Sequence, residues 1–241
     1  MASVLGTSAK IGGVGALGEE VWIILPAYNE QADLGDALAA LSPLRASVVV
    51  VDDGSTDETS AVALRHGAWV LRHLFNCGQG AALQTGLDFA LSRGAGVLVT
   101  FDADGQHAAE DIERLVKPVV EGQVDVALGS RFLGRAVGLP WGRRLVLRLG
   151  VWFTRVFSRV EVTDTHNGLR AFSRRAAQQI RITQNRMAHA SEILDQLRRH
   201  GLRYQEVGVT IRYSPRTLAK GQSSWNSLKI VGKLLLGRLL Q

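Results

Sequence analysis

The stretch "GVLVTFDADGQH" (96–107) decides the fold that this sequence predicts. Its first half is a short apolar run that follows a glycine, which is typical of a buried β-strand. Two carboxylates, Asp102 and Asp104, come directly after this run and stand one residue apart. Because like charges repel each other, two carboxylates at the end of a strand indicate a site that holds a positive charge.

Strands and helices alternate on both sides of this stretch. Apolar runs predict strands at 21–25, 47–51, 68–73, 96–101 and 125–132. The segments between them predict helices at 31–42, 78–94 and 108–122, and one that Ser55 or Thr56 caps and that runs to about residue 66. This alternation predicts an α/β fold with a mostly parallel, doubly wound sheet flanked by helices. Ligands of such sheets bind beyond the carboxyl ends of the strands, so motifs at those ends should share one rim.

The pattern changes after Arg131. We expect helices at 142–159 and 187–201, a strand at 204–213, and a loop leading into a helix over "TDTHNGLRAFSRRAAQQI" (163–180). We therefore expect a flexible leader, one α/β domain of two halves, and a cationic amphipathic helix at the end. Their residue ranges are 1–20, 21–222 (halves 21–130 and 131–222) and 223–241.

Charge divides the chain in the same place. Residues 1–130 carry 7 Lys/Arg and 17 Asp/Glu, a net charge of −10, whereas residues 131–241 carry 21 and 5, a net charge of +16. An acidic half suits a metal ion and a basic half suits an anionic ligand, although arginines solvated on helix faces would give the same count. The sequence pI of about 10.0 suggests a protein that binds nucleic acid. However, the basic half has no recognised base-reading module, so we expect no nucleic-acid partner.

The single cysteine, Cys77, excludes an intramolecular disulfide, which fits a reducing cytoplasm. No apolar run approaches the roughly 20 residues that cross a bilayer. The segment "GVGALG" (13–18) matches the dinucleotide-binding pattern in letters only, because a strand follows it instead of preceding it.

The acidic motif "DADGQH" (102–107) has several interpretations. A calcium-binding EF-hand loop requires glycine at its sixth position, where His107 stands, and a helix upstream, where a strand is expected. A phosphatase with an aspartate nucleophile would have Thr or Val at the position of Gln106. A solvated acidic turn explains an isolated pair, but not its position beside other rim motifs. The remaining interpretation is a Mg²⁺ or Mn²⁺ clamp on a nucleotide diphosphate, with the amide oxygen of Gln106 as a further ligand.

Two other strand ends carry polar motifs. In "VVVVDDGSTDET" (48–59), Asp52 and Asp53 can accept hydrogen bonds from a ring N–H or a ribose hydroxyl. The alternative role of this segment is helix capping, which its hydroxyl groups serve without either aspartate. In "LPAYNE" (25–30), Tyr28 offers an aromatic face and Glu30 an acid.

Together these motifs resemble inverting family 2 glycosyltransferases, most closely those that use dolichol or polyprenol phosphate. The resemblance covers about residues 21–220 and is carried by "LPAYNE", "VVVVDDGSTDET", "NCGQGAALQTGL", "TFDADGQH" and "VALGSRF" in this order. It implies a GT-A fold, a nucleotide-sugar donor of the GDP-mannose or UDP-glucose type, and a divalent cation, Mg²⁺ or Mn²⁺.

The resemblance also implies roles for individual residues. The nucleoside would be contacted by Pro26, Tyr28, Glu30 and Asp53, with Asp52 beside them. The metal and diphosphate would be held by Asp102, Asp104 and Gln106. Arg131 would approach the phosphates. In the second half, Arg143 in "LPWGRRL" (139–145) and Lys220 in "TLAKGQSS" (217–224) stand where related enzymes place basic residues near phosphate. The loop with Asp164 has Asn167 where the family has serine, and Glu192 lies on the helix "MAHASEIL" (187–194).

Two kinds of acceptor remain open from the sequence. A hydroxyl acceptor, as in polysaccharide assembly, needs a general base, for which Asp164 and Glu192 are the candidates. A polyprenyl phosphate is already an anion and needs cations instead, which the basic half supplies. The expected partners are this lipid and either a membrane surface or a membrane partner chain beneath residues 223–241, with the enzyme peripheral at the cytoplasmic face.

The rival interpretations are a nucleotidyltransferase and a non-catalytic scaffold that binds nucleotide sugars. A nucleotidyltransferase would have a glycine-rich basic loop where this chain has "PAYNE", and a scaffold would not need Asp102, Asp104 and Arg131 together. The sequence predicts no oligomeric state.

Overall fold

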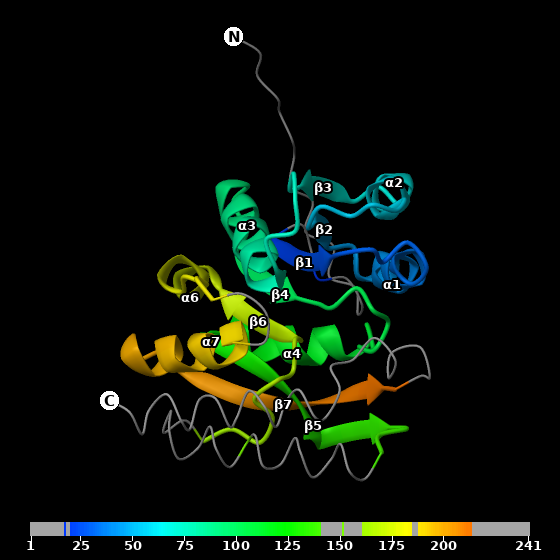
Figure 1. The fold of residues 1–241 in the computed structure, drawn as a ribbon. Helices are drawn as coiled ribbons and strands as arrows, with labels where there is room; N and C mark the ends of the chain where they lie inside the picture. Colours follow the sequence, from blue (N-terminus) through cyan, green and yellow to red (C-terminus); the bar gives the residue numbers. More distant parts are fainter. Residues whose placement is uncertain (1–16, 18–19, 141–150, 152–160, 185–187, 214–241) are drawn as a thin grey trace, which may run out of the picture.

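A computed structural model of the chain describes residues 17, 20–140, 151, 161–184 and 188–213. One seven-stranded sheet forms its centre, in the order β3-β2-β1-β4-β6-β5-β7 (Figure 1). The strands are β1 Val21–Ala27, β2 Ser47–Asp52, β3 Trp69–Arg72, β4 Val97–Thr100, β5 Val126–Val137, β6 Arg170–Ser173 and β7 Tyr204–Arg212. Strand β6 runs antiparallel to β4 and β5, while the other pairs are parallel. The predicted mostly parallel α/β sheet is confirmed.

Helices cover both faces of the sheet (Figure 1). They are α1 Leu34–Leu41, a 3₁₀ turn η1 Ser42–Leu44, α2 Thr59–Arg65, α3 Gln79–Ser92, α4 Asp111–Val120, α6 Arg174–Gln179 and α7 Ala188–Arg199. The buried side chains of α1, α2 and α4 belong to one apolar core, and those of α3, α6 and α7 belong to the other. The fold therefore has three layers, and every motif at a strand end lies at the edge of the middle layer.

Strand β1 shows why the sheet is sealed on both sides. Val21, Ile23 and Leu25 enter the core beneath α1, whereas Trp22 and Ile24 enter the core beneath α3. The side chains from Val21 to Leu25 are therefore all buried, which explains the unbroken apolar sequence of this part of the strand.

Two sequence expectations need correction. Residues 170–173 form strand β6, where we expected a loop, because a run of four residues that begins with arginine carries no strand signal. Helix α2 begins at Thr59 without a side-chain cap, so neither Ser55 nor Thr56 caps it. The Ser55 hydroxyl instead accepts a hydrogen bond from the backbone N–H of Asn29 at 2.9 Å.

Several expectations lie outside the described residues: most of the leader 1–20, most of the helix 142–159, and the C-terminal helix 223–241. Among the helices that the structure describes, none has the length and apolar character needed to cross a membrane.

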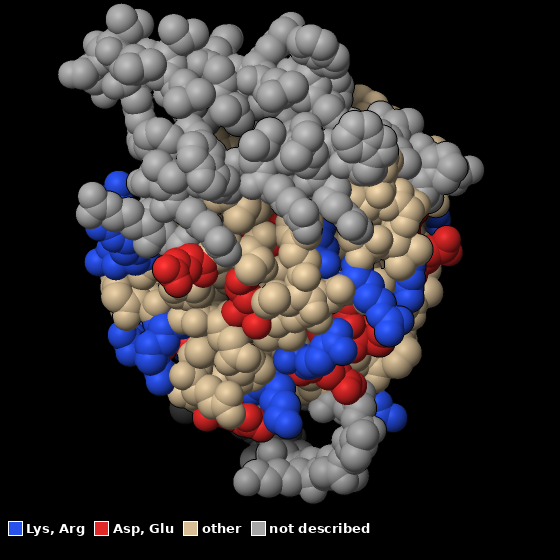
Figure 2. Space-filling view, turned by 90° about the horizontal axis from the view of Figure 1, so that it is seen from below, with Lys and Arg blue, Asp and Glu red and all other residues tan. Residues whose placement is uncertain are grey.

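The charge asymmetry is partly neutralised within the fold. Five arginines of the second half pair with carboxylates: Arg131 with Asp164, Arg175 and Arg203 with Asp125, Arg181 with Asp88, and Arg212 with Glu110. Figure 2 shows basic and acidic side chains interspersed on the described part of one face. Four of these arginines, all except Arg131, pair with carboxylates of the first half, so part of the +16 charge is neutralised between the two halves.

Two helical glycines give a matched test of packing between α3 and the sheet. A Cβ on Gly86 would lie 2.4 Å from Ile24 Cγ2, whereas a Cβ on Gly35 in α1 would lie 3.5 Å from His66 Cε1, an ordinary contact. We expect Gly86→Ala to lower the free energy of unfolding by about 2 kcal/mol because the core is overpacked. Gly35→Ala should leave it unchanged or raise it by about 0.5 kcal/mol, since alanine restricts the unfolded chain. Urea denaturation measures both values, and equal effects would contradict this packing.

Candidate active site

The loops after β1 and β2 are joined into one unit at the rim. The N–H of Asp53 donates to the carbonyl of Ala27 at 2.8 Å, which continues the pairing of the two strands. Beyond the strands, the N–H of Thr56 donates to Asn29 Oδ1 and the N–H of Glu30 donates to Thr59 Oγ1, both at 2.9 Å. The motifs "PAYNE" and "DDGST" therefore form one surface.

The ring and the acid of "PAYNE" lie on that surface. Tyr28 is 46% exposed and presents its ring to solvent, while Pro26 and Glu30 are half-buried. The charge of Glu30 acts on Asp104, which places the first-strand motif beside the acidic motif after β4.

Asp52 and Asp53 have different roles. Asp52 is fully buried, its Oδ1 accepts the N–H of Ser55 at 2.8 Å, and its Oδ2 accepts the hydroxyl of Ser60. Both oxygens therefore help to shape the loop, and a contact between Asp52 and the donor stays a prediction.

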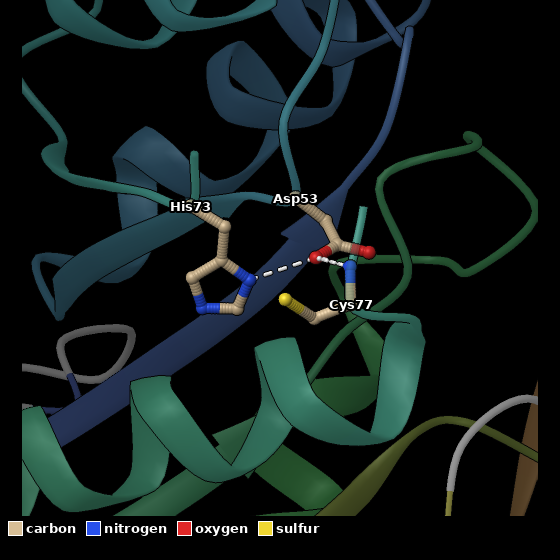
Figure 3. A group of neighbouring side chains, drawn as sticks. All are labelled: Asp53, His73 and Cys77. Atoms are coloured by element: carbon tan, nitrogen blue, oxygen red, sulfur yellow. Dashed lines mark hydrogen bonds and ion pairs between the residues drawn. The ribbon is translucent and has the colours of Figure 1, made fainter. Parts of the chain in front are cut away.

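Asp53 is held by the segment that precedes α3 (Figure 3). Its Oδ1 accepts from His73 Nδ1 at 2.7 Å and from the N–H of Cys77 at 2.8 Å. Its Oδ2 accepts from the N–H of Gly78 at 2.7 Å. The ligand atoms of Asp53, His73 and Cys77 lie within 4.8 Å of one another, which raises the question of a metal site. However, His73 uses Nδ1 toward Asp53 and Nε2 toward Thr85 Oγ1 at 3.0 Å. With both ring nitrogens engaged, the group is a hydrogen-bond network that fixes Asp53.

The two carboxylates after β4 are supported unequally. Asp102 Oδ1 accepts from Gln79 Nε2 and Oδ2 accepts from His107 Nε2, each at 3.0 Å. Asp104 accepts from the backbone N–H of Gln106 at 3.0 Å and from its side-chain amide at 2.6 Å. The side chain of Asp102 is 27% exposed, so its oxygens remain accessible.

The electrostatics of this pair fit a bound cation. Burial together with the negative charges of Asp102 and Glu30 raises the pKa of Asp104 to about 6. Burial also opposes the charge of Asp102, but the hydrogen bond and charge of His107, helped by His189 and Arg170, bring its pKa below the ordinary value. Two adjacent carboxylates that resist joint ionisation gain most from a divalent cation, and carboxylate and amide oxygens are ligands that Mg²⁺ and Mn²⁺ accept.

Arg131 and Asp164 form a buried ion pair. Asp164 Oδ2 accepts from Arg131 Nε at 2.6 Å and from the backbone N–H of Arg131 at 3.0 Å, and Arg131 Nη1 donates to the Tyr213 hydroxyl. The two side chains are only 9% and 2% exposed. Burial disfavours the charged form of Arg131, but the charge of Asp164 outweighs it and raises the pKa of the guanidinium above its ordinary value. The structure thus joins two residues to which the sequence assigned separate roles.

The loop after Asp164 brings the second half of the chain to the acidic motif. The hydroxyl of Thr100 donates to the carbonyl of Gly168 at 2.6 Å, and a Cβ on Gly168 would lie 2.2 Å from Asp102 Oδ2. Arg170 begins β6 and is buried; burial lowers its pKa to about 10, against the opposing charges of Asp102 and Asp164. This guanidinium electrostatically links the acidic motif to the Arg131–Asp164 pair.

Glu192 on α7 stabilises a loop. Its carboxylate accepts from the N–H of Thr183, the hydroxyl of Thr183 and the N–H of Gln184, at distances of 2.5 to 3.1 Å. This arrangement argues against the expectation that Glu192 is a free general base. Arg143 and Lys220, the two expected phosphate contacts, lie outside the described residues.

Sequence reasoning missed the side chains that support the acidic motif: Gln79, His107, Arg170 and His189. Gln79 opens α3 directly after the strand-end loop, and His107 belongs to the motif itself, so position alone pointed toward them. Arg170 and His189 had no such signal, because their neighbours lie far away in the sequence.

Comparison with known proteins identifies the class. Residues 22–181 match the family described as glycosyl transferase family 2, and the chain belongs to that family and is a glycosyltransferase. An uncharacterized protein of Methanocaldococcus jannaschii is 36% identical over 92% of this chain and 93% of its own length. A UDP-N-acetylglucosamine–dolichyl-phosphate N-acetylglucosaminyltransferase of Methanococcus voltae is 30% identical over 90% of this chain and 95% of its own.

Two further comparisons agree with the family and the fold. A polyprenol monophosphomannose synthase of Mycolicibacterium smegmatis is 34% identical over 66% of this chain and 63% of its own length. Among solved structures, glucosyl-3-phosphoglycerate synthase from Mycobacterium tuberculosis, in complex with Mn²⁺, UDP and glucosyl-3-phosphoglycerate, superposes with a TM-score of 0.67 at 23% identity. That match covers 90% of this chain and 79% of the other. The fold is GT-A, as expected from the sequence.

The close approach of Gly168 to Asp102 is testable. We expect Gly168→Ala to fold but to displace the Asp102 carboxylate, which lowers kcat/KM about 100-fold, since small misplacements in a site carry that cost. Mn²⁺ affinity, measured by calorimetry, should fall in parallel. Gly96→Ala is the control, because its Cβ would lie 3.5 Å from the Glu20 side chain. Unchanged affinity and activity in Gly168→Ala would contradict the assigned contact.

The Arg131–Asp164 pair predicts a thermodynamic coupling. Asp164→Asn or Arg131→Gln should each lower the free energy of unfolding by about 3 kcal/mol, because the remaining charge is buried without its partner. The double variant should lose clearly less than the two single losses combined, by about 1 kcal/mol or more. Denaturant titration of the four proteins measures this coupling, and additive losses would show that the two side chains act independently.

Proposed function

We propose that this glycosyltransferase moves a hexose, with inversion, from a nucleotide-diphosphate sugar to a polyprenyl phosphate. The observation that carries the acceptor assignment is that neither sequence-predicted general base is free. Asp164 is ion-paired to Arg131, and Glu192 accepts three hydrogen bonds from residues 183 and 184. A hydroxyl acceptor would require one of them to take a proton, whereas a phosphate acceptor arrives as an anion.

The donor site follows the rim. Pro26, Tyr28 and Asp53 would receive the nucleoside, with Glu30 at the junction with the acidic motif. Asp102, Asp104 and Gln106 would hold Mg²⁺ or Mn²⁺, which supplies positive charge against the diphosphate leaving group. The solved relative with Mn²⁺ and UDP supports a divalent cation and a nucleotide in this fold.

The chain's own residues would orient the donor. Gln79 and His107 hold Asp102 in one orientation, and Gly168 leaves the space that this carboxylate occupies. Arg131 has five N–H donors, of which Asp164 and Tyr213 engage two, so the rest can contact the phosphates. Arg143 and Lys220 are proposed as further cations for the acceptor phosphate.

The names of relatives support the lipid acceptor. One relative is a dolichyl-phosphate N-acetylglucosaminyltransferase and another is a polyprenol monophosphomannose synthase. A lipid acceptor implies work at a membrane surface, and we propose a peripheral position at the cytoplasmic face. Residues 223–241 or a membrane partner chain would provide the attachment.

The test is a transfer assay with vesicles that contain polyprenyl phosphate, Mn²⁺ and a panel of UDP- and GDP-sugars. We expect a lipid-linked hexose, loss of transfer with EDTA, and a loss of about 100-fold or more in Asp104→Asn, since charge stabilisation at the diphosphate is removed. Glu192→Gln should keep transfer within about threefold, because a loop contact, not a proton acceptor, is changed. Full transfer by Asp104→Asn would contradict the proposed site. Transfer only to a saccharide hydroxyl, with loss in Glu192→Gln, would contradict the proposed acceptor.

A further inference from the structure

We propose that Glu206 is a positioning residue of the transfer reaction, which holds the loop of Asp164 and thereby aims the guanidinium of Arg131. The inference rests on the proposed function, because there Arg131 acts on the phosphates. The contact that carries it lies between strand β7 and the loop before β6.

The carboxylate of Glu206 holds two consecutive backbone N–H groups. The N–H of Thr163 lies 2.8 Å from Oε1 and 2.9 Å from Oε2, and the N–H of Asp164 donates to Oε1 at 3.2 Å. The hydroxyl of Thr163 also donates to Oε1, at 2.9 Å. One side chain of β7 therefore fixes both the backbone of this loop and the side chain of Thr163.

The hydroxyl of Thr163 extends this contact to β5. It lies 2.6 Å from the hydroxyl of Ser130, which is fully buried. Because a carboxylate only accepts, Thr163 gives its single proton to Glu206 and accepts a hydrogen bond from Ser130. The Ser130 oxygen in turn accepts from the N–H groups of residues 132 and 133, each at 3.3 Å. This chain of hydrogen bonds therefore fixes β5 on both sides of Arg131.

The register of β7 explains why a carboxylate can face the loop. Strand β7 lies at the edge of the sheet and pairs in parallel with β5, with Glu206 opposite Leu128 (Figure 1). The neighbouring Val207 and Val209 enter the apolar core that includes α4. Side chains alternate along a strand, so Glu206 points to the opposite face of the sheet, where it meets the loop.

The loop held by Glu206 determines where Arg131 points. Asp164 Oδ2 accepts from Nε of Arg131 at 2.6 Å and from its backbone N–H at 3.0 Å. Since Glu206 fixes the N–H of Asp164, and the carboxylate of Asp164 holds Arg131, a displaced loop would carry the guanidinium with it. A displacement of about 1 Å can cost on the order of 100-fold in rate. Glu206 therefore acts on the reaction through Asp164.

Transfer kinetics of the full-length protein test this role. The assay uses vesicles with polyprenyl phosphate, Mn²⁺ and the nucleotide sugar that the wild-type protein turns over. Glu206→Ala should lower kcat about tenfold or more and leave KM for the donor within about threefold, because Arg131 acts on charge that develops in the transition state. Glu206→Gln should keep kcat within about threefold, since an amide oxygen in place of Oε1 still accepts from the loop.

Asp125→Ala is the matched control. Asp125 precedes β5, at the end of the strand away from the rim, and its Oδ2 accepts the backbone N–H of Arg203 at 2.9 Å. It is therefore also a carboxylate that holds a backbone donor beside β7. The variant should lose stability as Glu206→Ala does, but it should keep kcat within about threefold because Arg131 stays in place.

Thr163→Val gives the same readout if Glu206→Ala does not fold. It removes the hydroxyl between Ser130 and Glu206 but keeps the two backbone donors, so the loop is loosened and not released. We expect kcat to fall about fivefold. An unchanged kcat in this variant would overturn the positioning role.

Backbone hydrogen exchange tests the positioning without a substrate. The N–H of Arg131 donates to Asp164 and not to Glu206, so its exchange rate reports on the position of the Asp164 carboxylate. This N–H should exchange about tenfold faster or more in Glu206→Ala than in Asp125→Ala, when both are measured under conditions that give them equal stability.

The outcomes separate this inference from the proposed function. The positioning role is overturned by an unchanged kcat in Glu206→Ala, by an equal loss in Asp125→Ala, or by equal exchange of the Arg131 N–H in both variants. A loss in Glu206→Gln as large as in Glu206→Ala would also overturn it. Failure of the wild-type protein to transfer any sugar would instead count against the proposed function, and the exchange rates would still test the position of the loop.

Discussion

The repulsion between Asp102 and Asp104 is the constraint around which this site is organised. Both carboxylates follow one buried strand, and burial, together with the charge of the first, raises the pKa of the second to about 6. The surrounding residues stabilise the first carboxylate: Gln79 and His107 donate to it, and Arg170 adds a buried positive charge nearby. What remains unbalanced is the negative charge of Asp104, which is where a divalent cation has most to contribute.

This constraint also explains how the two halves of the chain meet. Strand β6 runs against its neighbours and places Arg170 beside Thr100, so that a cation from the second half enters the acidic rim of the first. The loop before β6 passes so close to Asp102 that only glycine fits at position 168. The same loop carries Asp164, which forms the buried ion pair with Arg131 of β5. One loop therefore connects the acidic motif with the Arg131–Asp164 pair.

The sequence predicted the features that depend on local pattern. Apolar runs located β1, β2 and β4, and the carboxyl-end rule for parallel strands correctly gathered their motifs on one rim. The sequence could not distinguish the contacts of Asp52 from those of Asp53. The difference lies in hydrogen-bond partners such as Ser60, His73 and Gly78, which only the fold brings near. It also missed β6, whose four residues become a strand only because β4 and β5 lie on either side.

We infer that one cation, held after β4, joins the donor nucleotide to this rim. This inference is tested most directly by anomalous diffraction from crystals grown with Mn²⁺ and UDP. We expect an anomalous peak within bonding distance of Asp102 and Asp104, with the diphosphate beside it and the base near Asp53. A peak at Asp53, His73 and Cys77, or no peak at the acidic motif while UDP is bound, would contradict it.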